Sequence, residues 1–173
     1  MRLYLMTLMA VLACYAVAQN NRVYIEDFEI VPGDSVTVPV VLANQDTTYG
    51  FQFGMMLPHG LEVKDVRLSD DFTQLGFNLN HGVRNGNCMV MVYSLKQLYC
   101  VPDSVKVLEV DFGARPGFKG GEITLWKGRG ASSDNQCIYL DDGTVRVSVP
   151  KRSLVGIPID QQQGDAHFNT DEW

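Results

Sequence analysis

The sequence predicts an all-β fold, a sandwich of two sheets built from about eight or nine short strands. Between residues 22 and 149, apolar and polar residues alternate over short stretches, and Gly, Pro, Asn or Asp separates one stretch from the next. No long window has the periodicity of an amphipathic helix. Because a single sheet of so many strands would leave one apolar face uncovered, we expect two packed sheets.

The clearest predicted strand covers residues 35–42. Its even-numbered residues from Val36 to Leu42 are all aliphatic, whereas the odd-numbered ones include Ser, Thr and Pro. This period of two places the aliphatic side chains on one face of a strand and is not that of a helix. Pro39 has no N–H to donate to a neighbouring strand, so we expect an edge or a bulge at this point.

The next two predicted strands lie at residues 51–57 and 61–68. In the first, Phe51 and Phe53 face one way, and Gln52 and Gly54 face the other. In the second, the apolar alternation changes phase after residue 63. One extra residue near positions 64–65 explains this change, which predicts a β-bulge there.

Five further strands are predicted along the rest of the domain, at residues 74–80, 88–94, 105–112, 122–127 and 144–149. The strand at 88–94 is apolar on both sides. Val90 and Val92 face one way, while Met89, Met91 and Tyr93 face the other. This pattern is typical of a central strand that is covered on both faces.

The chain begins with the pattern of a secretory signal peptide at residues 1–18. Arg2 precedes an apolar run, and residues 16–18, Ala-Val-Ala, form a small-x-small cleavage pattern. The run is shorter than the roughly 20 residues that span a membrane. We therefore expect no transmembrane segment in the mature chain, which would be secreted to the periplasm, the cell surface or the extracellular space. The folded domain is expected at 19–149 and a flexible tail at 150–173.

Cys14 permits a second interpretation of the same segment. Residues 11–14, Val-Leu-Ala-Cys, loosely resemble a bacterial lipobox, whose cysteine is lipidated. The pattern at 16–18 is the better cleavage site, so we favour a secreted protein over a lipoprotein.

Three cysteines remain in the mature chain. Export permits a disulfide, and an odd number leaves one thiol over. A hairpin centred on Ser94 would place Cys88 opposite Cys100, which makes this the first candidate for a disulfide. A bond between Cys100 and Cys137 is also possible, as are three buried thiols that act as small apolar groups.

Charge and motifs exclude several classes of function. The formal net charge is −6 and no Lys/Arg cluster is present, which argues against nucleic acid and anionic membranes as partners. His59, His81 and His167 do not have the spacing of metal ligands. The acidic pairs at 70–71 and 141–142 are adjacent residues, which point to opposite faces of a strand and so do not form a glycosidase pair. We expect no enzyme, no metal site and no cofactor.

Two segments resemble a known family. Residues 32–40, Pro-Gly-Asp-Ser-Val-Thr-Val-Pro-Val, are similar to the opening of cohesin domains, in which a Gly-Asp turn leads into a Val/Pro strand that ends near an Asn, here Asn44. Gly-Phe-Gln-Phe at 50–53 and Leu-Pro-His-Gly-Leu-Glu-Val at 57–63 resemble the following segments, in the form found in cohesin-like domains of secreted Bacteroidetes proteins.

The resemblance implies a jelly-roll sandwich, the architecture that cohesins share with certain carbohydrate-binding modules. It also implies a non-catalytic module that binds a protein partner, of the dockerin type or another, through one sheet face. Such a face is mostly polar with a few apolar anchors. By this resemblance the binding face includes the residues Gln52, Gly54, Asn78, Asn80 and Tyr93.

Polysaccharide binding is the alternative function, in a module attached to polysaccharide use. Trp126 is out of phase with Ile123 and Leu125, so its ring is expected to point outward. Together with Tyr99 and Tyr139 it could stack on a sugar ring. A tryptophan that caps the end of the core is the competing interpretation.

Overall fold

The structure is a computed structural model that describes residues 21–150, except 97, 99, 101–102 and 135. The predicted signal peptide, the lipobox cysteine Cys14 and the tail after residue 150 lie outside the described residues, as does Tyr99. No helix among the described residues is long and apolar enough to cross a membrane.

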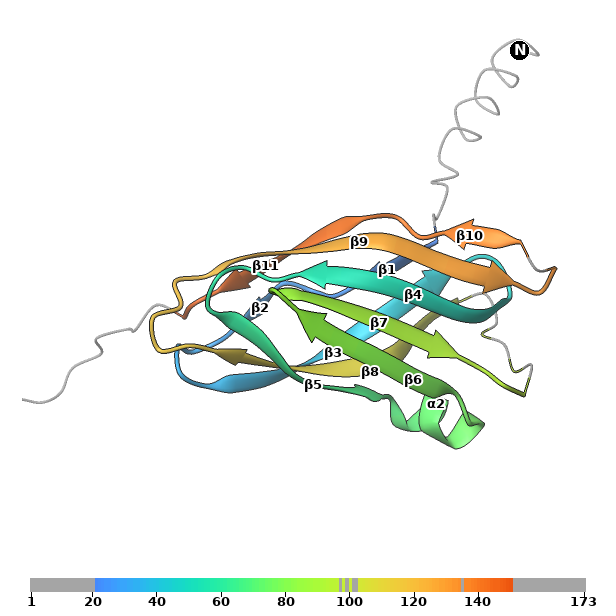
Figure 1. Cartoon of the computed structure of the whole chain (residues 1–173), viewed down its shortest axis with the longest axis horizontal. Helices are drawn as coiled ribbons and strands as arrows, with labels where there is room; N and C mark the ends of the chain where they lie inside the picture. Colours follow the sequence, from blue (N-terminus) through green and yellow to red (C-terminus); the bar gives the residue numbers. More distant parts are fainter. Residues whose placement is uncertain (1–20, 97, 99, 101–102, 135, 151–173) are drawn as a thin grey trace, which may run out of the picture.

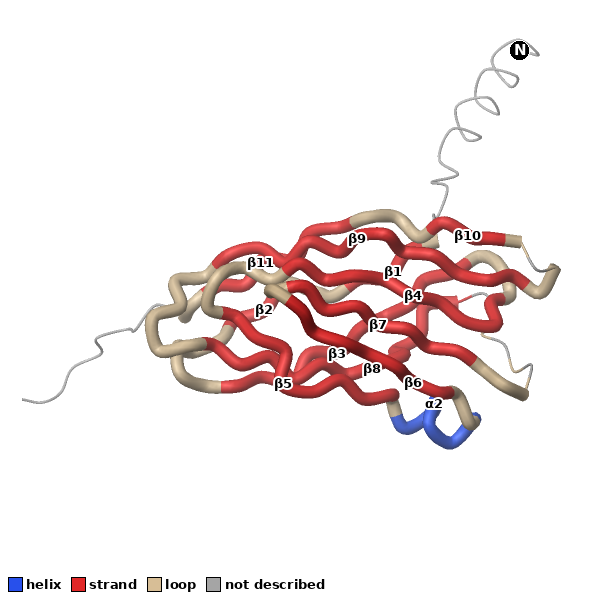
Figure 2. Tube along the Cα trace, viewed as in Figure 1, coloured by secondary structure: helices blue, strands red, loops and turns tan. Residues whose placement is uncertain are grey.

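Two β-sheets pack face to face, which confirms the predicted sandwich (Figures 1 and 2). The smaller sheet has the order β1 (Arg22–Tyr24), β3 (Ser35–Asn44), β8 (Asp103–Ala114), β5 (Leu61–Leu68). The larger sheet has the order β2 (Phe28–Glu29), β11 (Gly143–Ser148), β9 (Gly121–Ser132), β4 (Thr48–Met56), β7 (Asn87–Tyr93), β6 (Asn78–Arg84), and β10 (Cys137–Tyr139) also pairs with β9. The described residues thus form eleven strands, and the short β1, β2 and β10 account for the excess over the eight or nine expected.

The core lies between the sheets and consists of the apolar side chains that the alternation predicted. Phe53 and Met55 of β4 belong to the same core cluster as Leu108 and Phe112 of β8, and all four are essentially inaccessible to solvent. At roughly 25 cal/mol per Å² of buried apolar surface, side chains of this size stabilise the fold by about 2–3 kcal/mol each.

Two local predictions are confirmed at the residues concerned. Strand β1 pairs only with residues 41–43 of β3, so Pro39 lies where β3 is an edge strand, and the β3–β8 register shifts one residue later, between Val40 and Val41. In β5 the register with β8 shifts between Val63 and Asp65. This is the bulge that the change of phase predicted.

The strand predicted at residues 74–80 is wrong in its first half. Residues Asp70–Leu75 form the short helix α2, and β6 begins only at Asn78. The Ser69 hydroxyl accepts the Phe72 backbone N–H at 3.5 Å, and Gly76 ends the helix with φ +85°. A helix of six residues is too short for its periodicity to be recognised, whereas its two caps are local signals.

The predicted disulfide between Cys88 and Cys100 is not formed. Cys88 pairs with Met55 near the end of β4, whereas Cys100 pairs with Thr48 at its start. At about 3.3 Å per residue these positions are roughly 23 Å apart, far beyond the roughly 7 Å that a disulfide allows between Cα atoms. All three described cysteines are free thiols, including Cys137, so the alternative bond between Cys100 and Cys137 is also absent.

Candidate functional site

The outer face of the larger sheet carries the candidate site. Because Phe51, Phe53 and Met55 of β4 point into the core, the residues between them point outward. The cross-strand register extends this side over the neighbouring strands. We use "the outer face" for these outward residues: Thr124, Trp126, Lys127 and Arg129 of β9; Gly50, Gln52, Gly54 and Met56 of β4; Asn87, Met89, Met91 and Tyr93 of β7; Asn78, Asn80, Gly82 and Arg84 of β6; and Tyr139 of β10.

The structure brings all seven sequence-predicted binding residues onto this one face. A single cross-strand row contains Tyr139, Arg129, Gln52, Met91 and Asn80, in that order across five strands. The other predicted residues lie in the adjacent rows: Tyr93 is opposite both Gly50 and Asn78, and Trp126 is opposite Gly54. Their binding role remains a prediction.

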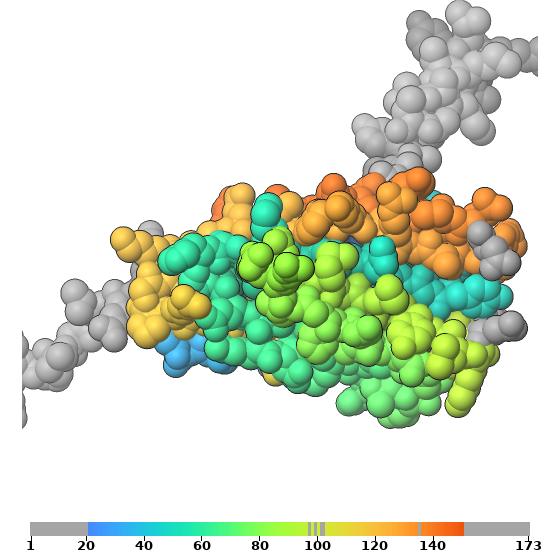
Figure 3. All heavy atoms as spheres, viewed as in Figure 1, coloured from blue at the N-terminus to red at the C-terminus, as the bar shows by residue number. Residues whose placement is uncertain are grey.

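The outer face is broad and shallow. Figure 3 views the sandwich from this side, where atoms of β9 and β10 (orange), β4 (teal) and β6 and β7 (green) adjoin one another. Two open hollows of about 290 and 270 Å³ flank Met91, and Gln52 borders both of them. Such a surface suits a partner that lies across it rather than a small molecule that is enclosed.

Two exposed methionines occupy the centre of this face. Met89 and Met91 retain 38% and 43% of their accessible surface, although β7 is flanked by β4 and β6. The expectation that β7 is covered on both faces is therefore wrong. Its position is central within the sheet, but Val90 and Val92 face the core and the methionines face solvent. Methionine side chains adapt readily to the shape of an apolar partner surface.

Trp126 lies on the outer face but is not open for stacking. A Cβ atom at Gly54 would lie 2.6 Å from Trp126 Nε1 and 2.9 Å from Met89 Sδ, so both side chains pack over this glycine. The Lys127 ammonium sits 4.4 Å from the centre of the indole ring. The tryptophan is thus held between the backbone of β4 and a cation that occupies the place of a stacked sugar.

A bulge in β9 places Trp126 and Lys127 in these positions. Between the pairs Gln52–Arg129 and Gly54–Trp126, β9 has two residues where β4 has one. Lys127 adopts φ +53°, and its backbone N–H donates to the Asp142 carboxylate at 3.1 Å. The acidic pair at 141–142 therefore has a structural role, because one of its members holds the bulge.

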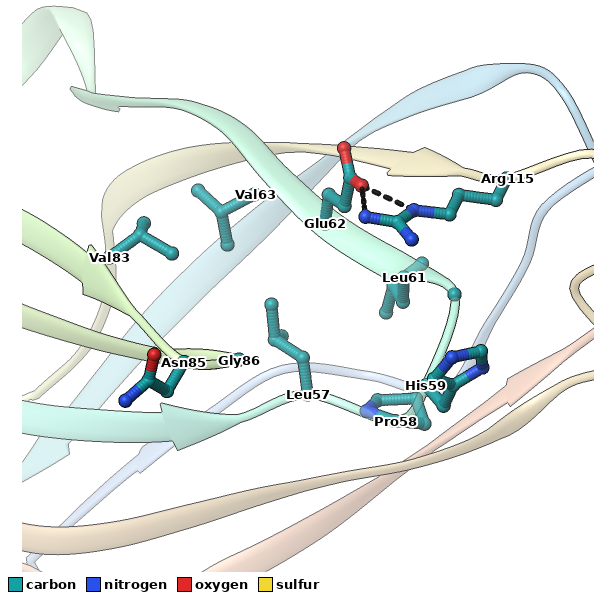
Figure 4. A pocket seen from close by; sticks show the side chains of 11 residues that line it. Leu57, Pro58, His59, Leu61, Glu62, Val63, Val83, Asn85, Gly86 and Arg115 are labelled. Carbon is teal, nitrogen blue, oxygen red and sulfur yellow. Dashed lines mark hydrogen bonds and ion pairs between the residues drawn. The ribbon is translucent and has the colours of Figure 1, made fainter.

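A third hollow lies at one end of the sandwich, between the edge strands β5 and β6. It has a volume of about 550 Å³ and is lined by Leu57, Val63 and Val83, with Glu62 and Arg115 on its rim (Figure 4). The Arg115 guanidinium lies 2.6 Å from a Glu62 oxygen. Hydrogen bonds from Lys64 and Arg115 hold the pKa of the Glu62 carboxyl below its usual value. A paired carboxylate of this kind is a poor general acid or base.

Reactive groups are scattered over the described part of the chain. His59 is in the turn between β4 and β5, whereas His81 is on β6, and His167 lies outside the described residues. Burial raises the pKa of the Cys88 thiol to about 11 and that of Cys100 to about 12, which makes both thiols unreactive. No cluster of three potential metal ligands occurs among residues 21–150 as described.

Comparisons with known proteins show the fold. No family model and no curated protein sequence matches the chain. Among solved structures, a non-cellulosomal cohesin from Archaeoglobus fulgidus superposes with a TM-score of 0.59 and 18% identity, over 74% of this chain and 91% of that one. The sixth cohesin of scaffoldin B from Acetivibrio cellulolyticus, solved in complex with a Cel5 dockerin mutant, has a TM-score of 0.62 and 15% identity, over 76% and 99%. A cohesin module from a family 33 glycoside hydrolase of Clostridium perfringens has a TM-score of 0.61 and 11% identity, over 77% and 100%.

These similarities confirm the cohesin-like fold that the resemblance implied. At such low identity they concern the arrangement of the strands and carry no single residue of a binding site. They also do not bear on a Bacteroidetes origin.

Proposed function

We propose that this chain is a secreted, non-catalytic interaction module that binds a protein partner through the outer face. One observation carries the proposal: Met89 and Met91 are exposed at the centre of a sheet face that is otherwise mostly polar. An apolar centre within a polar rim is the anatomy of a protein interface. Among the described residues, the histidines and thiols are too scattered to form a catalytic arrangement.

A dockerin-type module is the first candidate for the partner. Several proteins with this fold were solved as cohesin–dockerin complexes, including one from Acetivibrio cellulolyticus and one from Clostridium thermocellum. The support is an analogy of fold, and the residues of the outer face supply the part that is specific to this chain.

Calorimetry against a panel of purified dockerin modules tests the proposal. We expect binding by at least one dockerin and a loss of affinity of more than tenfold in Met91→Asp, because a carboxylate at the centre of the face would be desolvated on docking. Leu75→Asp is the matched control, since Leu75 is 55% exposed but lies on α2, outside the outer face.

Two results separate the parts of the proposal. If no dockerin binds, a dockerin is not the partner. If a dockerin binds equally well to the parent chain and to Met91→Asp, the outer face is not the binding surface.

Polysaccharide binding through Trp126 has less support. The Lys127 ammonium lies over the indole and the Arg129 guanidinium lies 5.0 Å from the centre of the Tyr139 ring, so both rings already carry a cation. We expect a glycan array to show no ligand that depends on Trp126. A glycan signal that is abolished by Trp126→Ala would reverse this conclusion.

A further inference from the structure

Cations are neutralised differently on the two sheets. All five ion pairs among the described residues lie on the smaller sheet and the loop that follows β8. Arg67 of β5 bridges Glu109 and Asp111 of β8 at 2.9 and 2.6 Å. Every cation of this network has a carboxylate partner within the chain, and mutual neutralisation leaves little net charge on that face.

On the outer face the cations rest on aromatic rings instead. Lys127 lies over Trp126 and Arg129 over Tyr139, and Arg129 also contacts the Cys137 sulfur at 3.9 Å. Such contacts satisfy a guanidinium or ammonium only in part and leave its charge uncompensated. The cationic groups therefore remain available to an anion from outside the chain.

Acidic residues are nearly missing from the strands of this face. Strands β4, β6, β7 and β10 contain no Asp or Glu, although the whole chain has a net charge of −6. The one acid of β9, Glu122, is exposed on the same side as Thr124 and Trp126, but it is at the start of the strand, four residues before Trp126 and opposite Arg146 of β11. Asp142 approaches Lys127, where its carboxylate accepts the backbone N–H. The residues defined as the outer face thus include three cations, Arg84, Lys127 and Arg129, and no acid, although Glu122 and Asp142 lie at its border and the chain is acidic as a whole.

The cations lie on strands that flank the two exposed methionines. Lys127 and Arg129 are on β9 and Arg84 is on β6, while Met89 and Met91 lie on β7 between these strands. Three strand spacings of about 4.8 Å separate β9 from β6, so the strands that carry the cations lie about 14 Å apart with the methionines between them. An α-helix with its side chains is about 10–12 Å across.

We propose that the partner element of the outer face is an acidic amphipathic helix. Its apolar side packs on Met89 and Met91, and its flanking carboxylates reach Arg129 and Lys127 on one side and Arg84 on the other. The proposal rests on the proposed function and adds the chemistry of the partner. A polyanionic sugar would match the cations but would leave the methionines without apolar contacts, so a protein helix is favoured.

Two synthetic helical peptides provide the probe. Both are of 18 residues with leucine along one face, and the remaining positions are Glu and Ala in one peptide and Lys and Ala in the other. Chemical-shift mapping on the ¹⁵N-labelled protein is expected to show the Glu peptide on β4, β7 and β9 and no binding of the Lys peptide. Polygalacturonate serves as the anionic sugar probe.

Charge reversal identifies the residues. The double variant Arg84→Glu/Arg129→Glu should weaken binding of the Glu peptide by at least about tenfold, since close charge pairs are replaced by like charges, and should gain affinity for the Lys peptide. Lys119→Glu, exposed in the loop between β8 and β9, is the single-charge control and should change the affinity by less than about twofold because distant charges are screened. Arg84→Gln/Arg129→Gln removes the charges without adding acids and should give an intermediate loss.

The inference is overturned if the Lys peptide binds as well as the Glu peptide, if charge reversal leaves affinity unchanged, or if polygalacturonate binds this face while the Glu peptide does not. A dockerin whose binding depends on Met91 but not on Arg84 and Arg129 would contradict this inference and leave the proposed function intact. If dockerin binding depends neither on Met91 nor on Arg84 and Arg129, the outer face is not the binding surface, and the proposed function itself is contradicted.

Discussion

Two glycines on the outer side of β4 allow a quantitative test of how the candidate site is built. A Cβ at Gly54 would meet the ends of side chains, Trp126 Nε1 at 2.6 Å and Met89 Sδ at 2.9 Å. A Cβ at Gly50 would meet backbone, the Val92 carbonyl oxygen at 2.7 Å and the Tyr93 Cα at 3.1 Å. Gly54→Ala thus presses on side chains that can move, whereas Gly50→Ala presses on the backbone of β7 and disturbs the pairing of β4 with β7.

The expected free energies of unfolding follow from this difference. Overpacking costs about 1–3 kcal/mol, while replacing a strand glycine with alanine returns about 0.5–1 kcal/mol by restricting the unfolded backbone. Trp126 is half-buried and Met89 is partly exposed, so both can shift outward in Gly54→Ala and keep its cost at the lower end. We expect a net loss of about 0–1 kcal/mol for Gly54→Ala and about 1–2.5 kcal/mol for Gly50→Ala.

Urea denaturation measures both values, and tryptophan fluorescence supplies an independent signal. The native emission of Trp126 should change in Gly54→Ala, because the alanine methyl group displaces the indole from the β4 backbone. It should stay as in the parent chain in Gly50→Ala. The reasoning is refuted if Gly54→Ala is the more destabilised variant, or if both variants leave the emission unchanged.

Three further predictions concern the core, the thiols and the ion pairs. Phe112→Ala should lower the free energy of unfolding by about 3–5 kcal/mol in urea denaturation, because Phe112 is fully buried and its ring stacks on that of Phe28 at a centroid distance of 5.3 Å. A loss below about 1 kcal/mol would contradict this packing. At pH 8 a thiol reagent should modify Cys137 in the native protein and reach Cys88 and Cys100 only after unfolding, since burial raises the pKa of these two thiols to about 11 and about 12. Rapid labelling of all three cysteines in the native protein would disprove the burial of Cys88 and Cys100. The Thr37 hydroxyl and Arg67 hold the pKa of Asp111 below its usual value, so this carboxylate adds stability that is present above its unfolded pKa of about 4 and is lost as the pH falls through its folded pKa. The stability difference between the parent chain and Arg67→Met should therefore be largest near neutral pH and shrink below about pH 4, and a difference that grows on acidification would contradict the pairing.

The sequence was sufficient for features that are set by neighbouring residues along a strand. The alternation in β3 and β4 predicted which side chains fill the core, because a strand fixes the direction of each side chain by its parity. The change of phase in β5 located a bulge to within a residue, and Pro39 marked the part of β3 that has no partner on one side. Each of these conclusions needs only local geometry.

Features that depend on distant strands could not be obtained in this way. The pairing of Cys88 with Cys100 assumed a hairpin around Ser94, but β7 pairs with β4 and β6, and Cys100 meets the far end of β4. The bulge at Lys127 is held by Asp142, which lies just before β11, so no pattern within β9 itself predicts it. The short helix α2 interrupted a stretch whose composition also suits a strand.

The exposed methionines of β7 show most clearly why a binding surface is hard to recognise by composition. An apolar residue in the middle of a sheet indicates that something covers it, and the sequence does not say whether the cover is the same chain or another molecule. For Val90 and Val92 the cover is the smaller sheet of this chain. Met89 and Met91 remain 38% and 43% exposed, so the described part of the chain covers them only in part. The uncompensated cations on the same face add a polarity that a buried layer would not tolerate. A strand that is apolar on both sides, in a sheet whose neighbouring strands carry unpaired cations, therefore indicates an interface, provided that the fold first establishes which side faces the core.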